Sequence, residues 1–111
     1  MKSYLVGFLL LLPTLSWAST QDAVKIQQIN VNRELGQVFI QTTIPASPAG
    51  CHTDTHWNYT FLLTNEADNA MYSTLLSAKI AGKTLSLVGF AACPSTGYGA
   101  VEELRWATII D

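Results

Sequence analysis

The chain has 111 residues, of which 8 are acidic and 6 are basic, and its formal net charge at pH 7 is −2. A length of this order accommodates one small domain. The few basic residues are scattered along the sequence, which argues against a nucleic-acid-binding protein and against a polybasic membrane-binding surface.

The first residues have the three parts of a secretory signal peptide. Lys2 supplies positive charge, residues 4–12 form an apolar run, and Ser16 and Ala18 are small residues at the two positions that a signal peptidase recognises. The run is too short to cross about 30 Å of hydrocarbon comfortably. We therefore expect cleavage after Ala18, no integral membrane segment after processing, and a mature domain of residues 19–111 in a bacterial periplasm or beyond.

Cys51 and Cys93, the two cysteines of the chain, both fall in the predicted mature domain. An even pair in a small exported domain is expected to form a disulfide. On the chain-entropy account, closing a loop of this length stabilises the fold by about 4 kcal/mol. The alternative, a pair of free or metal-binding thiols, lacks a CxxC spacing.

Period-two alternation predicts two strands in the first half of the mature domain. In the first, residues 24–32, the alternation slips at Gln27-Gln28. Such a slip is typical of a β-bulge, which would bend the strand so that both of its apolar pairs face one core. A turn at residues 33–36 leads to the second strand, residues 38–44, and the composition of residues 45–50 indicates a loop.

A third strand and one helix follow. Residues 57–63 carry an aromatic-rich face typical of a half-buried strand, with Trp57 expected in the core. Asn65 is suited to cap a helix at its start and Gly82 at its end. Between them an apolar stripe at helical spacing consists of Ala67, Met71, Tyr72, Leu75, Leu76 and Ala78.

Two further strands, residues 84–90 and 100–110, are separated by a loop at residues 93–99. Alternation in the last strand predicts Trp106 in the core, on the face opposite Glu103 and Arg105. This strand could pair with a second copy of the chain at a sheet edge. Its charged side chains (Glu102, Glu103, Arg105) could equally prevent such pairing.

The order of three strands, one helix and two strands predicts a β-rich α+β domain. It fits a five-stranded OB-like barrel in which the helix lies between strands three and four. A two-layer α+β sandwich with an open sheet is the alternative. The bend expected in the first strand favours the barrel, because closure requires such bends.

Several segments carry a resemblance to known proteins; they are Gly50-Cys51, Trp57, residues 69–79, residues 82–89 and Cys93. Together they resemble a group of small secreted bacterial OB-fold proteins and, more distantly, the receptor-binding B subunits of subtilase-type AB5 toxins. The resemblance implies an OB fold, one disulfide and a ring-forming, glycan-binding subunit. It assigns no sugar-contacting residue to a position in this chain.

His52, Asp54 and His56 alternate along the segment after Cys51, so an extended backbone would place all three side chains on one side. Two imidazoles and a carboxylate are ligands that zinc accepts. The alternative is a polar loop in which Thr53 or Asp54 caps a turn. Because the spacing matches no recognised zinc signature, we expect no metal and no other cofactor.

Glycan binding requires exposed aromatic rings for sugar faces and polar groups for hydroxyls. Tyr98 lies in a glycine-flanked loop and is the best exposed aromatic candidate. Asp54, His56 and Thr96 are polar candidates in the predicted loops. These four residues form the predicted ligand-binding set.

The sequence lacks a convincing catalytic arrangement. It has no G-x-S-x-G nucleophile motif, and Glu102 and Glu103, as neighbours in a strand, would point to opposite faces. We therefore expect a non-catalytic secreted module that binds a carbohydrate or a protein, with a homo-oligomeric ring as one form. The alternatives are a periplasmic structural or inhibitory protein that binds another protein, and a metal-dependent activity at His52, Asp54 and His56.

Overall fold

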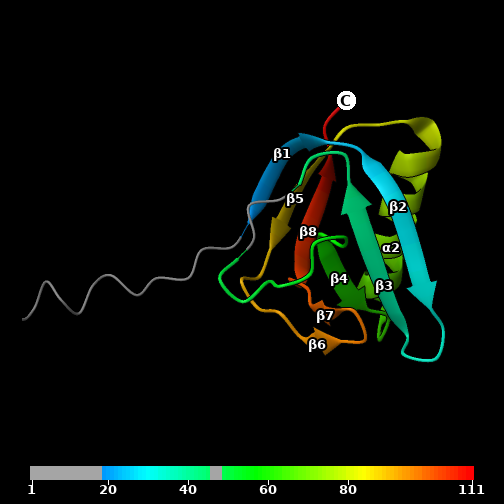
Figure 1. Ribbon diagram of the computed structural model, residues 1–111. Helices are drawn as coiled ribbons and strands as arrows, with labels where there is room; N and C mark the ends of the chain where they lie inside the picture. Colours follow the sequence, from blue (N-terminus) through cyan, green and yellow to red (C-terminus); the bar gives the residue numbers. More distant parts are fainter. Residues whose placement is uncertain (1–18, 46–48) are drawn as a thin grey trace, which may run out of the picture.

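A computed structural model describes residues 19–45 and 49–111 (Figure 1). The predicted signal peptide, residues 1–18, lies outside the described residues. The elements in chain order are β1 (Thr20–Val24), β2 (Ile26–Asn32), β3 (Gln37–Thr42), β4 (Tyr59–Leu62), α2 (Glu66–Ala81), β5 (Leu85–Gly89), β6 (Ser95–Thr96), β7 (Gly99–Ala100) and β8 (Leu104–Ile109).

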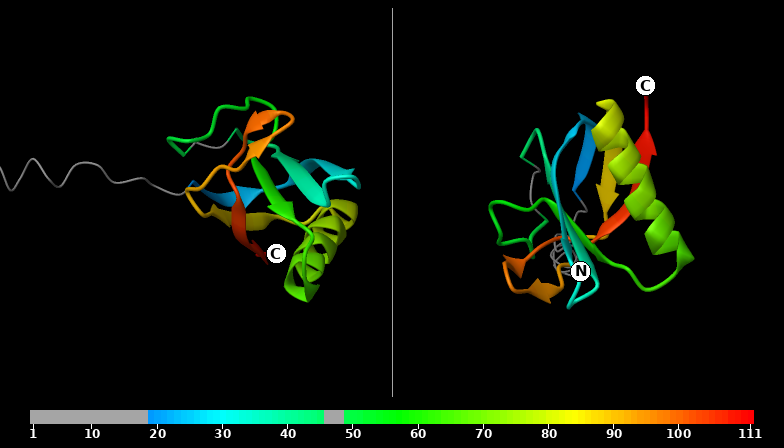
Figure 2. Two further views of the ribbon diagram at one scale, coloured as in Figure 1. Left: turned by 90° about the horizontal axis from the view of Figure 1, so that it is seen from below. Right: turned by 90° about the vertical axis from the view of Figure 1, so that its right-hand side faces the viewer.

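The strands form two 3-stranded antiparallel sheets, ordered β1-β5-β8 and β2-β3-β4, and a short β6-β7 hairpin. Only Lys25 separates β1 from β2, so the chain passes from one sheet to the other at a single bend. The α2 helix contacts β2 and β8, one strand of each sheet. Figure 2 shows the helix lying along one side of the two sheets.

The predicted β-rich class with one helix is confirmed, but the closed five-stranded barrel is not. On the side where β4 approaches β8, the described residues are joined by one parallel bridge, between Thr60 and Glu103. From Leu104 onward the chain pairs with β5, and among the described residues no further bridge joins it to β4. The domain therefore consists of two sheets that are joined by the bend at Lys25 between β1 and β2.

Two of the predicted strands are divided in the structure. The first is interrupted at Lys25, and its register with β3 shifts between Ile26 and Gln28, as the slipped alternation predicts. The last gives β7 and β8, while the predicted loop at residues 93–99 contains β6 and the start of β7.

The prediction that Trp106 lies in the core is wrong, since its side chain is 47% exposed. A register shift sets Leu104 opposite Gly89 and Trp106 opposite Val88. This shift reverses the alternation after Leu104, because one extra residue in a strand moves every following side chain to the other face. Ala107 packs against the core in place of Trp106.

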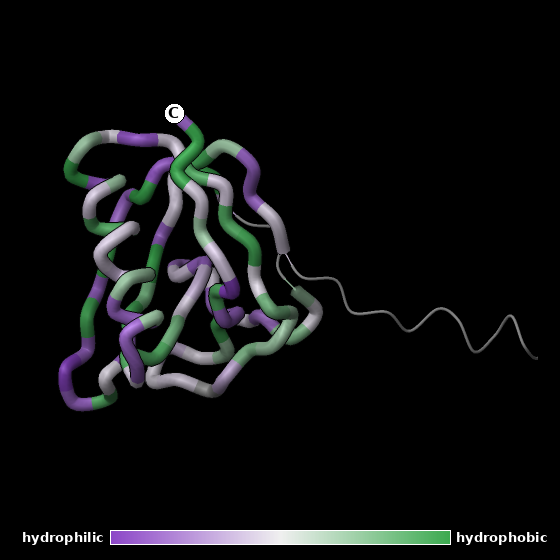
Figure 3. The backbone as a smooth tube through the Cα atoms, turned by 180° about the vertical axis from the view of Figure 1, so that it is seen from behind, coloured by the Kyte–Doolittle hydropathy of each residue, from purple (hydrophilic) through white to green (hydrophobic). Residues whose placement is uncertain are grey.

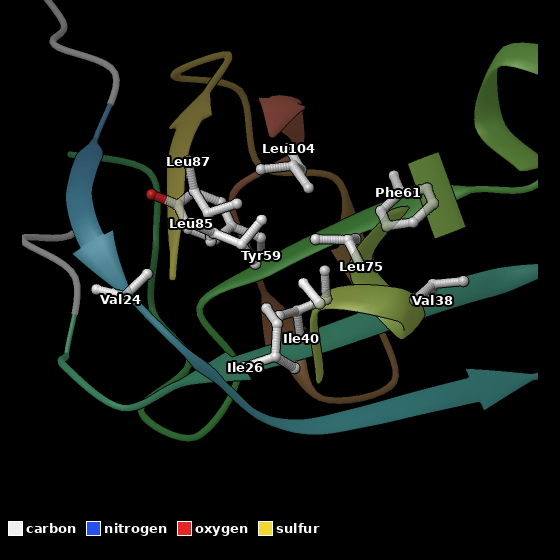
Figure 4. Close-up of a cluster of buried hydrophobic side chains, with 11 residues drawn as sticks. Val24, Ile26, Val38, Ile40, Tyr59, Phe61, Leu75, Leu85, Leu87 and Leu104 are labelled. Carbon is white, nitrogen blue, oxygen red and sulfur yellow. The ribbon is translucent and has the colours of Figure 1, made fainter. Parts of the chain in front are cut away.

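The main core lies between the two sheets and under α2. Figure 4 shows Ile40, Leu75 and Leu85 meeting there, one from each sheet and one from the helix. Figure 3 shows hydrophobic residues on strands around this core. Along β5, buried and partly buried residues alternate, as in a half-buried strand. A second, smaller cluster on the other side of β3 contains Phe39, Trp57 and Val101, so β3 is covered on both faces.

The predicted helix caps are confirmed. The Asn65 side chain accepts a hydrogen bond from the Asp68 amide at 2.9 Å, and Gly82 ends the helix with φ 65°. The apolar stripe is narrower than predicted, because Leu75 and Ala78 are buried whereas Leu76 is exposed.

Candidate functional site

An open cleft of ≈ 530 Å³ lies between the turn that joins β2 to β3 and the β6-β7 hairpin. Its lining residues are Asn30, Val31, Asn32, Arg33, Glu34 and Tyr98. The cleft joins one aromatic ring to two amides, one cation and one carboxylate. Such a combination offers both a flat apolar surface and hydrogen-bonding groups to a ligand.

The β2-β3 turn holds one wall of the cleft. The Leu35 amide donates to Asn32 Oδ1 at 3.1 Å, and the Gly36 amide donates to the Arg33 carbonyl at 3.3 Å. Gly36 has φ 60°, a conformation that glycine adopts without a steric penalty. The turn therefore presents Arg33 and Glu34, both exposed, from a fixed backbone.

The β6-β7 hairpin holds the other wall. Thr96 Oγ1 donates to the Gly99 carbonyl at 2.8 Å and accepts from the Tyr98 amide at 3.0 Å. The hairpin is tied to the segment after Cys51, because the Ala100 amide donates to Thr53 Oγ1 at 3.0 Å. Thr96 thus shapes the turn that carries Tyr98.

The Tyr98 ring rests on buried aromatic side chains and is still 45% exposed. The Tyr98 and Phe39 rings meet edge-to-face with centroids 4.9 Å apart, and the Trp57 centroid lies 6.0 Å from that of Tyr98. Edge-to-face contacts of this kind stabilise aromatic pairs. The ring is consequently positioned in advance, and Tyr98 lines the cleft.

The disulfide between Cys51 and Cys93 is confirmed, with Cα atoms 5.7 Å apart. It joins the segment that leads to Thr53 to the segment that leads into β6. Two connections, one covalent and one of hydrogen bonds, therefore hold the hairpin against the rest of the domain.

The three residues of the metal hypothesis are not brought together. His52 Nδ1 accepts from the Glu102 amide at 3.0 Å, whereas His56 Nε2 lies 2.9 Å from Gln28 Oε1. Asp54 Oδ2 accepts from the backbone amides of His56 and Trp57, the turn-capping role that was the alternative. Within residues 19–45 and 49–111, no group of three or more His, Cys, Asp or Glu side chains is placed to hold a metal ion.

Of the predicted ligand-binding set, the structure places Tyr98 and Thr96 in the hairpin of the cleft. His56 lines a separate pocket of ≈ 140 Å³ and packs edge-on against Trp57, at a centroid distance of 4.5 Å. Asp54 caps the adjacent turn by accepting hydrogen bonds from the backbone amides of His56 and Trp57. Sequence reasoning missed the wall at residues 30–34, because it treated those residues only as a strand end and a turn.

A second polar arrangement, also missed, is closed to solvent. Glu102 is 1% exposed, and its carboxylate accepts from the Ser19 hydroxyl, the Ser19 amide at 3.1 Å and the Ala91 amide at 3.0 Å. The Tyr59 hydroxyl lies 2.8 Å from Ser19 Oγ. Burial has the largest effect on the pKa of Tyr59 and raises it. The hydrogen bond with Ser19 lowers the pKa in part, the nearby Glu102 charge raises it, and the resulting pKa is about 12. We call Ser19, Tyr59 and Glu102 the Glu102 cluster.

Gly89 makes room for the Glu102 carboxylate. A Cβ atom at this position would lie 2.1 Å from Glu102 Oε2 and 2.3 Å from its carboxyl carbon. The glycine inside the predicted fourth strand was the one sequence signal for this arrangement, because a glycine in a strand often marks a close approach of another group.

Comparison of the chain with protein-family models, with curated proteins and with solved structures finds no match. No helix in the part of the chain that the structure describes has both the length and the apolar character needed to cross a membrane.

Proposed function

We propose that this chain is a secreted, non-catalytic binding module and that the Tyr98 cleft binds a carbohydrate. The observation that carries the proposal is a preorganised, half-exposed tyrosine ring facing a wall of amide, guanidinium and carboxylate groups. An aromatic face suits the apolar side of a sugar ring, and the polar wall suits its hydroxyls.

The chemistry of the cleft favours a sugar over other ligands. Arg33 and Glu34 bring one charge of each sign, so the cleft offers no concentrated positive potential for a polyanion. The net charge of −2 also argues against a polyanionic ligand. The amide, guanidinium, carboxylate and phenol groups of the cleft can each form hydrogen bonds with neutral hydroxyls.

The position of the cleft supports an OB-like relationship. In OB folds the strand 2–3 face and the loops after strands 1 and 4 bind oligosaccharides and oligonucleotides. If β1 and β2 are counted as one bent strand, the cleft lies at the turn after strand 1 and at the long loop between strands 4 and 5. The parallel bridge between Thr60 and Glu103 is where a closed barrel would be sealed.

The same relationship supports the resemblance to the B subunits of subtilase-type AB5 toxins. We propose a homo-oligomeric ring as a form of the protein, with the sheet-edge strand β8 as its means of pairing. The disulfide supports export, since such bonds persist in oxidising compartments. Light scattering of the exported chain tests the ring, and a monomer at all concentrations contradicts it.

A glycan array probed with the exported chain tests the carbohydrate proposal. We expect Tyr98→Ala to weaken binding of the strongest oligosaccharide at least about tenfold, because a central aromatic contact of an interface is lost. Tyr98→Phe keeps the ring and should retain most of the binding. Trp106→Ala is the matched control, since Trp106 has a similar exposure of 47% and lies outside the cleft.

The proposal fails if no glycan binds, or if Trp106→Ala weakens binding as much as Tyr98→Ala does. The first result would favour the other candidate function, recognition of a protein.

One surface favours protein recognition as that second candidate. The Arg105 guanidinium lies 4.7 Å from the Trp106 ring centroid and 5.6 Å from that of Phe90, which is 50% exposed. Tryptophan and arginine are the residues that most often dominate protein interfaces. A pull-down from a periplasmic extract with the wild-type chain, compared with Trp106→Ala and Tyr98→Ala, identifies which of the two surfaces a protein partner uses.

A further inference from the structure

The Glu102 carboxylate is buried without a positively charged partner among the residues that the structure describes. Its three hydrogen bonds come from the Ser19 hydroxyl and from the amides of Ser19 and Ala91, all of which are neutral donors. Burying a carboxylate carries a large desolvation cost, and buried charges in proteins are usually paired with an opposite charge. A cation at this place would complete the site.

The backbone nitrogen of Ser19 lies where such a cation is needed. It is 3.1 Å from Glu102 Oε2, and Ser19 itself is 5% exposed. Ser19 is held there from the other side, since its carbonyl accepts from the Gly89 amide at 3.0 Å. Ser19 is also the residue that directly follows the predicted cleavage point after Ala18.

We infer that cleavage after Ala18 makes Ser19 a buried N-terminal residue whose α-ammonium group forms an ion pair with the Glu102 carboxylate. This inference rests on the proposed export of the chain. It assigns Glu102 a positioning role for the mature N-terminus, and it gives the processing step a structural consequence.

The chemistry of the cleavage supplies the charge. A signal peptidase hydrolyses the bond between Ala18 and Ser19, so that water leaves a carboxylate on Ala18 and an amine on Ser19. An α-amino group has an ordinary pKa of about 7.7–8.0 and is mostly protonated at pH 7. One neutral amide proton near Glu102 is thereby replaced by an ammonium group with three protons.

The surrounding residues favour this pair. Ser19 Oγ donates to the other oxygen of the same carboxylate, so one residue engages both Glu102 oxygens. Tyr59 is fully buried beside Ser19 and is neutral at pH 7, so it adds no negative charge that would compete with Glu102 for the ammonium group. A charge-assisted hydrogen bond in such a buried place is stronger than a neutral one.

The consequence is that processing stabilises the fold. The precursor can place Ser19 against Glu102 only as an amide, whereas the mature chain places a full positive charge there. The native state of the mature chain is thus favoured after export, when the leader has been removed.

The test uses chains purified from the periplasm of a bacterium that expresses the full precursor. A glycine inserted between Ala18 and Ser19 extends the mature N-terminus by one residue. Cleavage still falls after Ala18, because a shift by one would place Trp17 at a position that requires a small residue. N-terminal sequencing identifies each product, and urea unfolding at pH 7 gives its unfolding equilibrium constant.

We expect the extension to raise the unfolding equilibrium constant about tenfold or more, which corresponds to about 1.4 kcal/mol. In a Glu102→Gln background the same extension should change it less than about threefold, because no carboxylate remains to pair with the ammonium group. Glu103→Gln is the matched control: it removes the neighbouring, partly exposed carboxylate, and the full effect of the extension should persist.

If the Glu102→Gln variant does not accumulate in the periplasm, the unfolding comparison is replaced by reaction of the α-amino group with acetic anhydride. Mass spectrometry should show the Ser19 amine of the folded chain reacting at least about tenfold more slowly than the amine of the glycine-extended chain.

The outcomes separate the two proposals. A product that begins at a residue other than Ser19 overturns the proposed processing and the ion pair together. A product that begins at Ser19, with equal effects of the extension in the wild-type and Glu102→Gln backgrounds, overturns the ion pair alone. Equal acylation rates of the two amines do the same.

Discussion

The Glu102 cluster and the Tyr98 cleft both combine a tyrosine with a carboxylate, and they differ in what surrounds these groups. In the cluster, Tyr59 and Glu102 are buried and bonded to Ser19. In the cleft, Tyr98 and Glu34 are exposed, and their functional groups face solvent. The closed arrangement is spent on holding the fold together, whereas the open one leaves its polar and aromatic groups accessible to solvent.

The two regions are also held differently. The cluster is fixed by the packing of β1 and β5 around it, with Gly89 bonded to Ser19. The hairpin that carries Tyr98 contains only two short strands and depends on the disulfide and on Thr53. Perturbations of the whole fold and of the hairpin should therefore be separable.

Removal of the disulfide should have the largest effect. The link spans a sequence separation of 42, for which the chain-entropy account gives about 4 kcal/mol of stability. Cys51→Ala combined with Cys93→Ala should lower the free energy of unfolding by that order. Hydrogen exchange should show the Ala100 amide losing more protection than the Gly89 amide; equal losses would contradict the separation of the two regions.

Gly89→Ala should be the most damaging single substitution that leaves the disulfide intact. The new Cβ would overlap the Glu102 carboxylate, and moving this buried carboxylate away would break its three hydrogen bonds. We expect a loss of about 3 kcal/mol in urea unfolding. The control is Gly97→Ala in the open hairpin, where nothing lies within 4 Å of the added atom and the loss should stay within about 0.5 kcal/mol.

Alkaline pH should weaken the fold through the Glu102 cluster. The pKa of Tyr59 is raised from 10.0 in the unfolded chain to about 12 in the folded one, so the folded state holds this proton more tightly. The resulting stability is fully present below pH 10 and is lost as the pH rises through 12. Urea unfolding from pH 8 upward should show this loss, and Tyr59→Phe should remove the Tyr59 part of it.

Tyr98→Ala should have the smallest effect on stability. Its ring contributes an edge contact to Phe39 and remains 45% exposed, so the loss should be about 1 kcal/mol. Thermal unfolding measures this change. A loss as large as that of Gly89→Ala would mean that Tyr98 belongs to the core and is not held ready for a ligand.

Local sequence signals predicted the elements whose cause is local. The Asn65 and Gly82 caps bound the helix, the slip at Gln27-Gln28 coincides with a shifted register, and the cysteine pair forms its disulfide. Each of these depends on residues close in sequence or on a single chemical rule.

The missed features depend on contacts between distant segments. The cleft exists because Tyr98 meets a turn that lies more than sixty residues earlier in the chain. Glu102 is buried because Ser19 and Ala91 bring donors to it, and strand alternation alone describes it only as one of two adjacent acidic residues. Trp106 is exposed because one register shift between β5 and β8 reverses the alternation.

The most direct test of the carbohydrate proposal is an NMR titration of the exported, ¹⁵N-labelled chain with the oligosaccharide that binds most strongly on the glycan array. We predict that the amide shifts concentrate at residues 30–36 and 96–100, around the cleft, and leave Gly89 and Glu102 unchanged. Shifts centred instead on the β8 face at Trp106, or distributed without any focus at Tyr98, would contradict the account.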